Sequence, residues 1–265
     1  MTTPELAGAK PLSNKHAIVP GGTRGIGAAI ARKLLAQGAR VTIIGRNPQS
    51  MEKTLVPFVE SGEMARLSAD VTDTQALAKA FANASEHFGA IQILVNSAGQ
   101  ASSAPFLKTD AQLWQRMLSV NVDGAVHCIQ AALPGMLVAG WGRIVTVAST
   151  AGLVGYAYVS AYCASKHAII GLTRALALEV ATKGVTVNAV CPGFTETEML
   201  EATIANITAK TGRTAESARG DLAARNPQKK LVQPEEVANA VCWLCSPGSE
   251  SITGQAIAVA GGEVM

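Results

Sequence analysis

Ser149, Tyr162 and Lys166 have the types and spacing that suit acid–base chemistry on an oxygen atom. If the segment from residue 159 onwards is helical, Tyr162 and Lys166 lie one turn apart on the same face. A lysine ammonium beside a phenol favours the phenolate, so we expect the pKa of Tyr162 to fall from about 10 towards neutrality. Such a tyrosine can exchange a proton with a substrate oxygen near pH 7, and Ser149 can hydrogen-bond the same oxygen.

The same spacing also fits an ordinary helical pair, and serine is common in loops. The reaction must therefore be inferred from the elements around these residues. Short β-rich runs alternate with longer helical ones from residue 15 onwards. Strands are predicted at residues 16–20, 40–44, 65–69, 91–96, 143–148, 185–190 and 256–260. Helices are predicted at residues 25–38, 49–61, 76–89, 111–137, 159–182 and 234–245.

This alternation predicts an α/β fold, a Rossmann-type doubly wound parallel sheet with helices on both faces. Right-handed crossovers then place ligands at the carboxyl ends of the strands. Residues 1–14 are polar and are expected to form a flexible tail. We expect residues 15–265 to form one domain, in which the polar, helical segment 196–225 interrupts the strand–helix alternation.

Composition narrows the class of protein. Of 265 residues, 48% are apolar and 15% charged, and the mean hydropathy of +0.24 suggests that some outer surface is buried against partner subunits. A net charge of +3 without a basic run gives nucleic-acid binding little support. No N-terminal signal peptide is evident, and His127, Gln130 and Pro134 argue against a membrane span at 124–142.

The cysteines and histidines favour neither a disulfide framework nor a metal site. Five scattered cysteines suggest a reducing, cytoplasmic environment. Cys242 and Cys245 form a C-x-x-C pair, but they lie in an apolar helical run where both would face the core, and a second ligand pair is missing. The four histidines do not cluster at ligand spacing, so no metal is expected.

A glycine-rich turn, Gly21-Gly22-Thr23-Arg24-Gly25-Ile26-Gly27, stands between the first predicted strand and the first helix. Glycines there permit a tight turn and let a pyrophosphate approach the helix N-terminus, whose dipole favours negative charge. With Asn96-Ser97-Ala98-Gly99 after the fourth strand, Asn121, Ser149, Tyr162 and Lys166, the chain resembles the short-chain dehydrogenase/reductase family. The resemblance runs from about residue 16 to 265.

The choice of cofactor can be predicted after the second strand. NAD enzymes usually place an acidic residue there, whereas this chain has Gly45 followed by Arg46, with Arg24 in the glycine-rich turn. Two guanidinium groups suit a 2′-phosphate, so NADP(H) is favoured and NAD(H) remains possible. The resemblance implies that Asp70 holds the adenine amino group, with Val71 beside it.

Two residues depart from the family pattern, which usually has Thr at Pro20 and Asn at Ser97. Proline removes a hydroxyl and a backbone N–H, so we expect weaker cofactor binding or a more mobile turn. Ser97 keeps a hydroxyl and should change little.

The resemblance also implies roles for the catalytic residues. Tyr162 would give its proton to the developing alkoxide while Ser149 polarises the carbonyl. Lys166 would lower the pKa of Tyr162 and bind the nicotinamide ribose, and Asn121 would hold a water that links Lys166 to solvent. The full set expected to contact the cofactor is Gly21, Thr23, Arg24, Gly25, Ile26, Gly27, Arg46, Asp70, Val71, Asn96, Ala98, Gly99, Tyr162, Lys166, Pro192, Gly193, Thr195 and Thr197.

The segment 196–225 looks like the mobile lid that family members close over substrate. Its apolar residues would face a second wall formed by small or apolar residues between Ser149 and Tyr162, which suits a ketone with an apolar or aromatic substituent. The residues expected to contact substrate are Ser149, Ala151, Leu153, Val154, Tyr156, Tyr162, Met199 and Leu200.

The resemblance thus implies an NADPH-dependent reductase that transfers hydride reversibly between the nicotinamide and a ketone or secondary alcohol. Two alternatives to this reductase remain. The first is a 3-oxoacyl or 3-hydroxyacyl thioester reductase or dehydrogenase, which can use NAD and would prefer basic residues at the cleft mouth; the candidates are Arg213, Arg219, Arg225, Lys229 and Lys230. The second is a nucleotide-sensing protein without catalysis, although such proteins usually lose the tyrosine or lysine that this chain keeps. Family members generally form tetramers through the two long helices and the last strand, so a homotetramer is expected, with a dimer still open.

Overall fold

The fold is built on a parallel β-sheet with helices on both faces. The computed structural model describes residues 10–47 and 51–265. Within them, seven strands pair in the order β3-β2-β1-β4-β5-β6-β7, and every pair is parallel. The strands are β1 His16–Pro20, β2 Arg40–Gly45, β3 Met64–Ser68, β4 Ile93–Asn96, β5 Gly142–Val147, β6 Val185–Pro192 and β7 Ala256–Val259.

The predicted doubly wound fold is confirmed. Strands β1 and β6 are buried along their whole length and consist mainly of apolar residues, as expected for the central strands of a parallel sheet. The order of the strands reverses between β1 and β4. A crevice therefore opens at the carboxyl ends of these two strands, where ligands bind in open α/β sheets.

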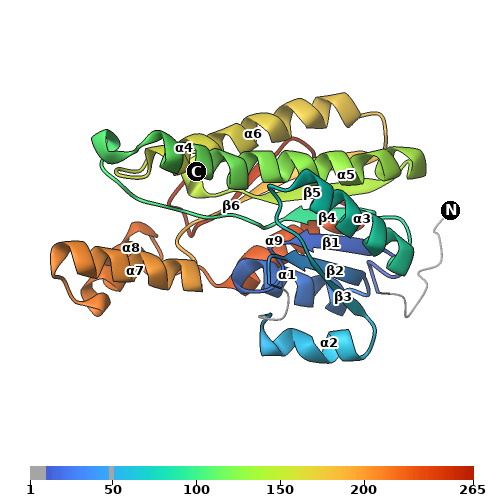
Figure 1. Cartoon of the computed structure of the whole chain (residues 1–265), viewed down its shortest axis with the longest axis horizontal. Helices are drawn as coiled ribbons and strands as arrows, with labels where there is room; N and C mark the ends of the chain where they lie inside the picture. Colours follow the sequence, from blue (N-terminus) through green and yellow to red (C-terminus); the bar gives the residue numbers. More distant parts are fainter. Residues whose placement is uncertain (1–9, 48–50) are drawn as a thin grey trace.

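Two helical layers cover the sheet (Figure 1). The helices of the main body are α1 Gly25–Ala36, α2 Val56–Glu60, α3 Thr74–Phe88, α4 Ala111–Leu118, α5 Gly124–Ala139, α6 Ser160–Val180 and α9 Pro234–Cys245. Helices α1 and α9 bury residues such as Leu34 and Leu244 against one face. Helices α3, α5 and α6 bury Phe81, Met136 and Leu176 against the other.

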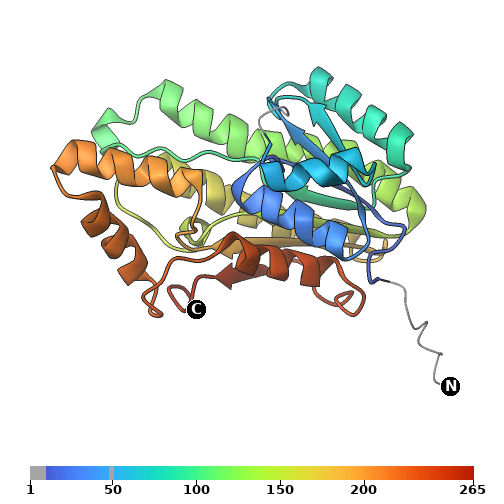
Figure 2. The same cartoon turned by 90° about the horizontal axis from the view of Figure 1, so that it is seen from below.

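Helices α7 Glu198–Thr211 and α8 Ala215–Arg225 project from one end of the molecule (Figures 1 and 2). They form the predicted lid segment and have a small core of their own, made by Leu200, Ile204, Ala218, Leu222 and Leu231. Arg219 pairs with both Glu196 and Glu201, and Asn206 donates to the Ser103 Oγ at 2.9 Å. The hydrogen bond between Asn206 and Ser103 ties the lid to the loop that follows β4.

The helix predicted over residues 111–137 is interrupted. Helix α4 ends at Leu118, a wider π-helical turn (η4, Ser119–Asp123) follows, and α5 begins at Gly124. By length and composition alone, residues 111–139 could cross a membrane, but a core helix meets the same criterion. Here Cys128, Ile129 and Met136 pack into the core.

Two other boundaries differ from the sequence prediction. Leu12, which was assigned to the flexible tail, is fully buried and its amide donates to the Gln37 carbonyl at 2.9 Å. The ordered chain thus begins before residue 15; residues 1–9 of the predicted tail lie outside the described residues. The helix predicted at 49–61 is the short turn η2 Lys53–Leu55 followed by α2, and its predicted start also lies outside them.

Candidate active site

Tyr162 and Lys166 lie one turn apart on helix α6, as predicted. The Lys166 Nζ lies 5.7 Å from the centroid of the Tyr162 ring and donates to the Val147 carbonyl at 3.0 Å. Val147 is the last residue of β5, so this bond fixes the lysine at the carboxyl end of the strand. Lys166 is almost completely buried, which shields its amine from bulk water.

Ser149 follows β5 and meets the tyrosine. Its backbone is extended, and its Oγ accepts the Ala151 N–H at 3.1 Å. The same side chain hydrogen-bonds the Tyr162 phenol. Two hydroxyl groups from different elements therefore converge at one point, where both can contact a single substrate oxygen.

The predicted effect of Lys166 on the tyrosine is wrong for this arrangement. Burial is the largest influence and raises the pKa of Tyr162 above its ordinary value, while the Ser149 hydrogen bond lowers it. Burial also lowers the pKa of Lys166 to about 8. The Lys166 amine donates to the Val147 carbonyl, and the group that lowers the pKa of Tyr162 here is the Ser149 hydroxyl, not the lysine.

Asn121 lies in η4 and is buried beside the lysine. Its Oδ1 accepts the Gln100 N–H at 2.9 Å, and its Nδ2 donates to the Gln100 carbonyl and to the Ser165 Oγ, both at 3.0 Å. A side-chain Cβ at Gly99 would lie 3.3 Å from the Asn121 Oδ1 and 3.7 Å from the Lys166 Nζ. Asn121 and Lys166 thus share one small region, and η4 is the kind of π-turn often found at functional sites.

The glycine-rich turn forms a tight cradle at the crevice between β1 and β4. Gly21 has a φ of +79°, and a Cβ there would lie 2.5 Å from the Ala98 amide nitrogen. A Cβ at Gly27 would lie 2.1 Å from the Gly21 carbonyl oxygen. Only glycine fits at either position, so the chain can turn sharply and leave its backbone open to a ligand.

The N-terminus of α1 fits a pyrophosphate. Its N-cap residue, Arg24, makes no side-chain capping bond, and the first turn has no acidic residue. The helix dipole and the backbone N–H groups other than that of Gly25 are therefore available for an anion. One carboxylate does approach: the Glu52 Oε1 accepts the Gly25 N–H at 2.6 Å and also pairs with Arg32.

The end of β2 supports a site for the adenosine end of a cofactor. A Cβ at Gly45 would lie 2.8 Å from the Thr23 Cγ2, so this position does not accept the acidic side chain of NAD enzymes without rearrangement. Arg46 is exposed. The pKa of Asp70 is lowered, mainly by the backbone N–H of Thr72 and to a smaller extent by Arg46. The carboxylate is therefore an ionised acceptor.

Arg24 is engaged differently from the prediction. Its Nη1 pairs with the Glu198 Oε2 at 2.7 Å, and both side chains are exposed. The arginine therefore links the glycine-rich turn to the first residue of α7. A phosphate would have to share or replace this partner.

The remaining predicted cofactor residues follow β6 and β3. Thr197 is the N-cap of α7, and a Cβ at Gly25 would lie 3.3 Å from its Cγ2. The Thr195 Oγ1 donates to the Gly193 carbonyl at 2.9 Å, which shapes the turn after Pro192. Val71 is buried next to α5. The structure therefore brings the segment after β6 next to the glycine-rich turn.

The residues predicted to contact substrate differ in how exposed they are. Val154 and Met199 are exposed and Leu153 is half-buried, as a cleft surface requires. Leu200 instead packs inside the lid core, so it does not offer the apolar surface predicted for it. Ala151 is buried.

Tyr156 is also more constrained than predicted. Its phenol contacts Thr150 and donates to Glu263, and Arg225 lies over its ring. Neither Glu263 nor Phe194, which contacts the same ring, was identified from the sequence. No local pattern in the sequence marks either residue.

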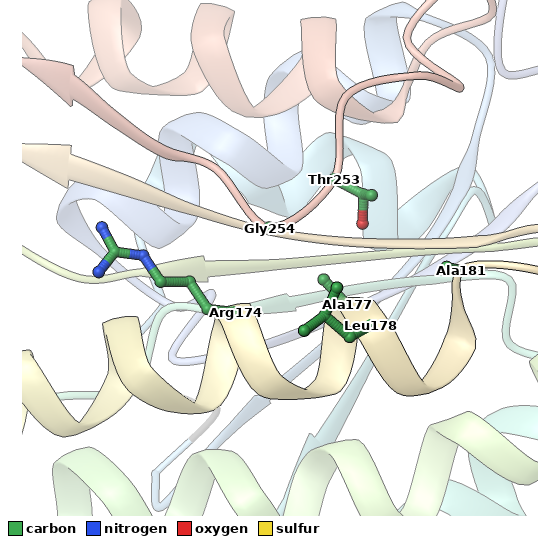
Figure 3. A pocket seen from close by; sticks show the side chains of 6 residues that line it. All are labelled: Arg174, Ala177, Leu178, Ala181, Thr253 and Gly254. Atoms are coloured by element: carbon green, nitrogen blue, oxygen red, sulfur yellow. The ribbon is translucent and has the colours of Figure 1, made fainter.

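A surface hollow of about 270 Å³ lies along the second half of α6 (Figure 3). It is lined by Arg174, Ala177, Leu178, Ala181, Thr253 and Gly254. Arg174 is eight positions after Lys166, about 12 Å along the helix. The hollow is therefore separate from the catalytic residues. Within the described residues, no cluster of three possible metal ligands occurs, and Cys242 and Cys245 are buried free thiols.

Comparison with known proteins identifies the family. The profile of a family described as enoyl-(acyl carrier protein) reductase matches residues 21–263. The chain belongs to the short-chain dehydrogenase/reductase family. It is 36% identical over 252 residues to a D-beta-hydroxybutyrate dehydrogenase of Rhizobium meliloti, covering 94% of this chain and 98% of that one. A putative ketoacyl reductase of Streptomyces coelicolor is 38% identical, with 93% and 95% coverage.

A solved structure agrees with these relatives. A crystal structure of a variant of actinorhodin polyketide ketoreductase with NADPH matches with a TM-score of 0.90 and 36% identity, covering 94% of this chain and 97% of that one. This short-chain dehydrogenase/reductase is thus an NAD(P)-dependent oxidoreductase that acts on CH–OH groups and their ketones. When bound, the nicotinamide supplies or accepts the hydride.

The residues of this chain would supply the proton and the orientation. The Tyr162 phenol, whose pKa is raised by burial, would donate its proton to the oxygen of a ketone as that oxygen gains charge. The Ser149 hydroxyl is placed to hydrogen-bond the same oxygen and fix its position. The glycine cradle, the N-terminus of α1 and the segment after β6 would hold the cofactor.

Proposed function

We propose that this chain is an NADPH-dependent ketone reductase whose substrates carry an apolar or aromatic substituent. The observation that carries the proposal is the convergence of Ser149 and the half-buried phenol of Tyr162 beside the Lys166 amine. The phenol is protonated near neutral pH, so it can supply the proton that ketone reduction needs. Exposed Val154 and Met199 and half-buried Leu153 supply the apolar surface.

The preference for NADPH rests on the end of β2. Gly45 leaves no room for a carboxylate beside Thr23, and the exposed Arg46 offers a guanidinium group that can bind a phosphate bidentately. We therefore expect kcat/KM for NADPH to exceed that for NADH with the same ketone. A clear preference for NADH would contradict this part of the proposal.

A 3-oxoacyl thioester is the second candidate substrate, and one observation favours it. Among the basic residues predicted for a thioester, Arg213, Arg219 and Lys230 are paired with acidic residues. Arg225 has no ion-pair partner among the described residues and lies over the rings of Tyr156 and Phe194. A stacked, exposed guanidinium can bind an anionic carrier group.

The test is NADPH oxidation measured with simple ketones, aryl ketones, β-keto esters and 3-oxoacyl thioesters. The first proposal predicts the highest kcat/KM with aryl or apolar ketones. Activity confined to thioesters would replace it with the second. No turnover with any carbonyl compound, together with retained NADPH binding, would favour a nucleotide-sensing protein.

We also propose a cytoplasmic homotetramer. Val138 at the end of α5 and Leu178 on α6 are 92% and 81% exposed, and Leu178 borders the hollow in Figure 3. Exposed apolar residues of this size on two neighbouring helices support the burial of that face against another copy. The five free thiols fit a reducing compartment.

A further inference from the structure

A chain of hydrogen bonds connects the catalytic segment to the C-terminal turn. Thr150 follows Ser149, and its Oγ1 lies 2.9 Å from the Tyr156 Oη. The Tyr156 Oη lies 2.7 Å from the Glu263 Oε1. A phenol has one proton, and a carboxylate is the stronger acceptor. Tyr156 therefore donates to Glu263 and accepts from the Thr150 hydroxyl.

The Tyr156 phenol remains a donor over the whole working pH range. Its pKa is raised to about 12, mainly by burial, with smaller contributions from Glu263. The phenol is thus a fixed link and not an acid that exchanges protons with substrate. This separates its role from that of Tyr162.

The ring of Tyr156 makes a second set of contacts, to the lid. Phe194, just after β6, meets it edge to face with centroids 6.2 Å apart. The Arg225 guanidinium, at the end of α8, lies 5.3 Å from the Tyr156 centroid and 5.9 Å from that of Phe194. One side chain therefore joins the Ser149 segment to the end of the lid.

The C-terminal turn is held closely against the same structures. A Cβ at Gly193 would lie 2.9 Å from the Glu263 Oε2. A Cβ at Gly261 would lie 2.0 Å from the Asn226 Oδ1, and Asn226 directly follows α8. The carboxylate is thus placed by backbone packing on both sides, and it is not a freely moving surface group.

We propose that Glu263 is a positioning residue for the substrate site. It holds the Tyr156 phenol, and Tyr156 in turn fixes the segment that carries Ser149 relative to the end of the lid. The role rests on the proposed ketone reduction, because Glu263 itself touches no reacting atom. It sets the distance between the two walls, so its loss should weaken ketone binding more than it slows the chemical step.

The kinetic test uses variants that remove either end of the Tyr156–Glu263 bond. Glu263→Ala and Tyr156→Phe should each raise the ketone KM by about tenfold, as expected for the loss of a hydrogen bond to a carboxylate. The double variant should be no worse than either single one, because both remove the same bond. Glu263→Gln keeps an acceptor and should stay within about twofold of wild type.

Two readouts exclude a general loss of structure. The NADPH KM and the kcat per active site should change by less than about threefold in these variants, since the cradle and Tyr162 are untouched. Glu60→Ala, which removes an exposed carboxylate at the end of α2, is the matched control and should behave as wild type. Unchanged ketone KM, or strictly additive effects in the double variant, would overturn the proposal.

Amide hydrogen exchange tests the same proposal without turnover. Glu263→Ala and Tyr156→Phe should speed exchange in both residues 149–158 and residues 220–227, and leave β2 unchanged. Wild-type exchange in either segment would overturn the link between them. If wild type reduces no ketone, the proposed function fails, while exchange still decides whether Glu263 couples the two walls.

Discussion

At the scale of single residues, the proposed chemistry depends on the phenol of Tyr162, whose pKa is raised by burial. The sequence predicted a tyrosine activated by its lysine neighbour, because four positions along a helix bring two side chains together. The structure adds what spacing alone lacks: the Lys166 amine is buried and donates to Val147, and desolvation dominates both pKa values. Under the proposed function, Tyr162 would donate the proton to the ketone and Lys166 would not act on it directly.

Tyr162→Phe tests the proton donor directly. Ketone reduction should fall by about 10²- to 10⁴-fold in kcat, the usual range for a lost general acid, while NADPH affinity stays unchanged. Tyr158→Phe is the matched control, because Tyr158 is 67% exposed. Steady-state kinetics with the best ketone measure the effect. Turnover of the Tyr162 variant near the wild-type rate would show that the assigned mechanism is wrong.

The buried Lys166 amine also predicts how stability depends on pH. Its pKa is about 8 in the folded chain, whereas the ordinary value for lysine is 10.5. Between these two pH values the unfolded chain therefore binds more protons than the folded chain. The free energy of unfolding should therefore rise with pH from 8 towards 10, by about 2 kcal/mol between pH 7.5 and 9.5.

Urea unfolding of wild type and Lys166→Met across that range measures the difference. The variant should lack this rise, since it has no amine to titrate. The comparison stops below pH 10, because the raised pKa of Tyr162 makes the phenol act in the opposite direction there. Parallel curves for the two proteins would contradict the prediction.

At the scale of elements, strands were predictable and helix interruptions were not. Buried parallel strands are rich in apolar and β-branched residues and are bounded by turns, so their ends were placed within about two residues. The π-turn at Asn121 leaves the apolar pattern of a long helix intact, so the sequence predicted one helix over residues 111–137. The carboxyl ends of parallel strands meet at the same edge of the sheet. The residues that follow these strands could therefore be predicted to form the candidate site.

Contacts that depend on distant segments could not be predicted. Tyr156 and Glu263 are 107 positions apart, and nothing near either residue marks the other as its partner. Leu200 was assigned to the substrate wall because it is apolar, yet the packing of α7 on α8 turns it into the lid core. Glu198, the first residue of α7, pairs with Arg24 of the glycine-rich turn, 174 positions away.

The Arg24–Glu198 contact gives a prediction for the lid. Glu198→Gln should free the Arg24 guanidinium to bind the 2′-phosphate of NADPH. The KM for NADPH should fall by up to about fivefold, the size expected for an exposed ion pair, while the KM for NADH should not change. Glu216→Gln, in the first turn of α8, is the control. An increase in the NADPH KM would instead show that Glu198 holds Arg24 in its productive position.

The glycine-rich turn gives a second prediction at this scale. Pro20 is the last residue of β1; its carbonyl accepts the Ser97 N–H at 3.0 Å, and proline offers no N–H in return. Pro20→Thr should lower the Kd for NADPH by a few fold, because that is about the effect of one added hydrogen bond. Fluorescence titration with NADPH measures it. Unchanged affinity would show that the turn is already fully held by its other contacts.

At the scale of the whole molecule, the exposed apolar face of α5 and α6 is the feature that a monomer does not explain. Leu178 is 81% exposed beside the hollow in Figure 3, and α5 ends with the exposed pair Leu137 and Val138. Leu178→Asp should shift the proposed homotetramer to a smaller species, because an unpaired carboxylate in an apolar interface is strongly disfavoured.

Light scattering after size exclusion measures this shift. Leu107→Asp is the matched control. Leu107 is 97% exposed, but it lies in the short turn η3 (Phe106–Lys108) and not on α5 or α6. Because α6 carries Tyr162 and Lys166, dissociation should also lower activity at dilution, and NADPH binding should decline less than turnover. A Leu178 variant that keeps the wild-type mass would place the subunit contact on another face, and the strand edge at β7 would then be the surface to substitute.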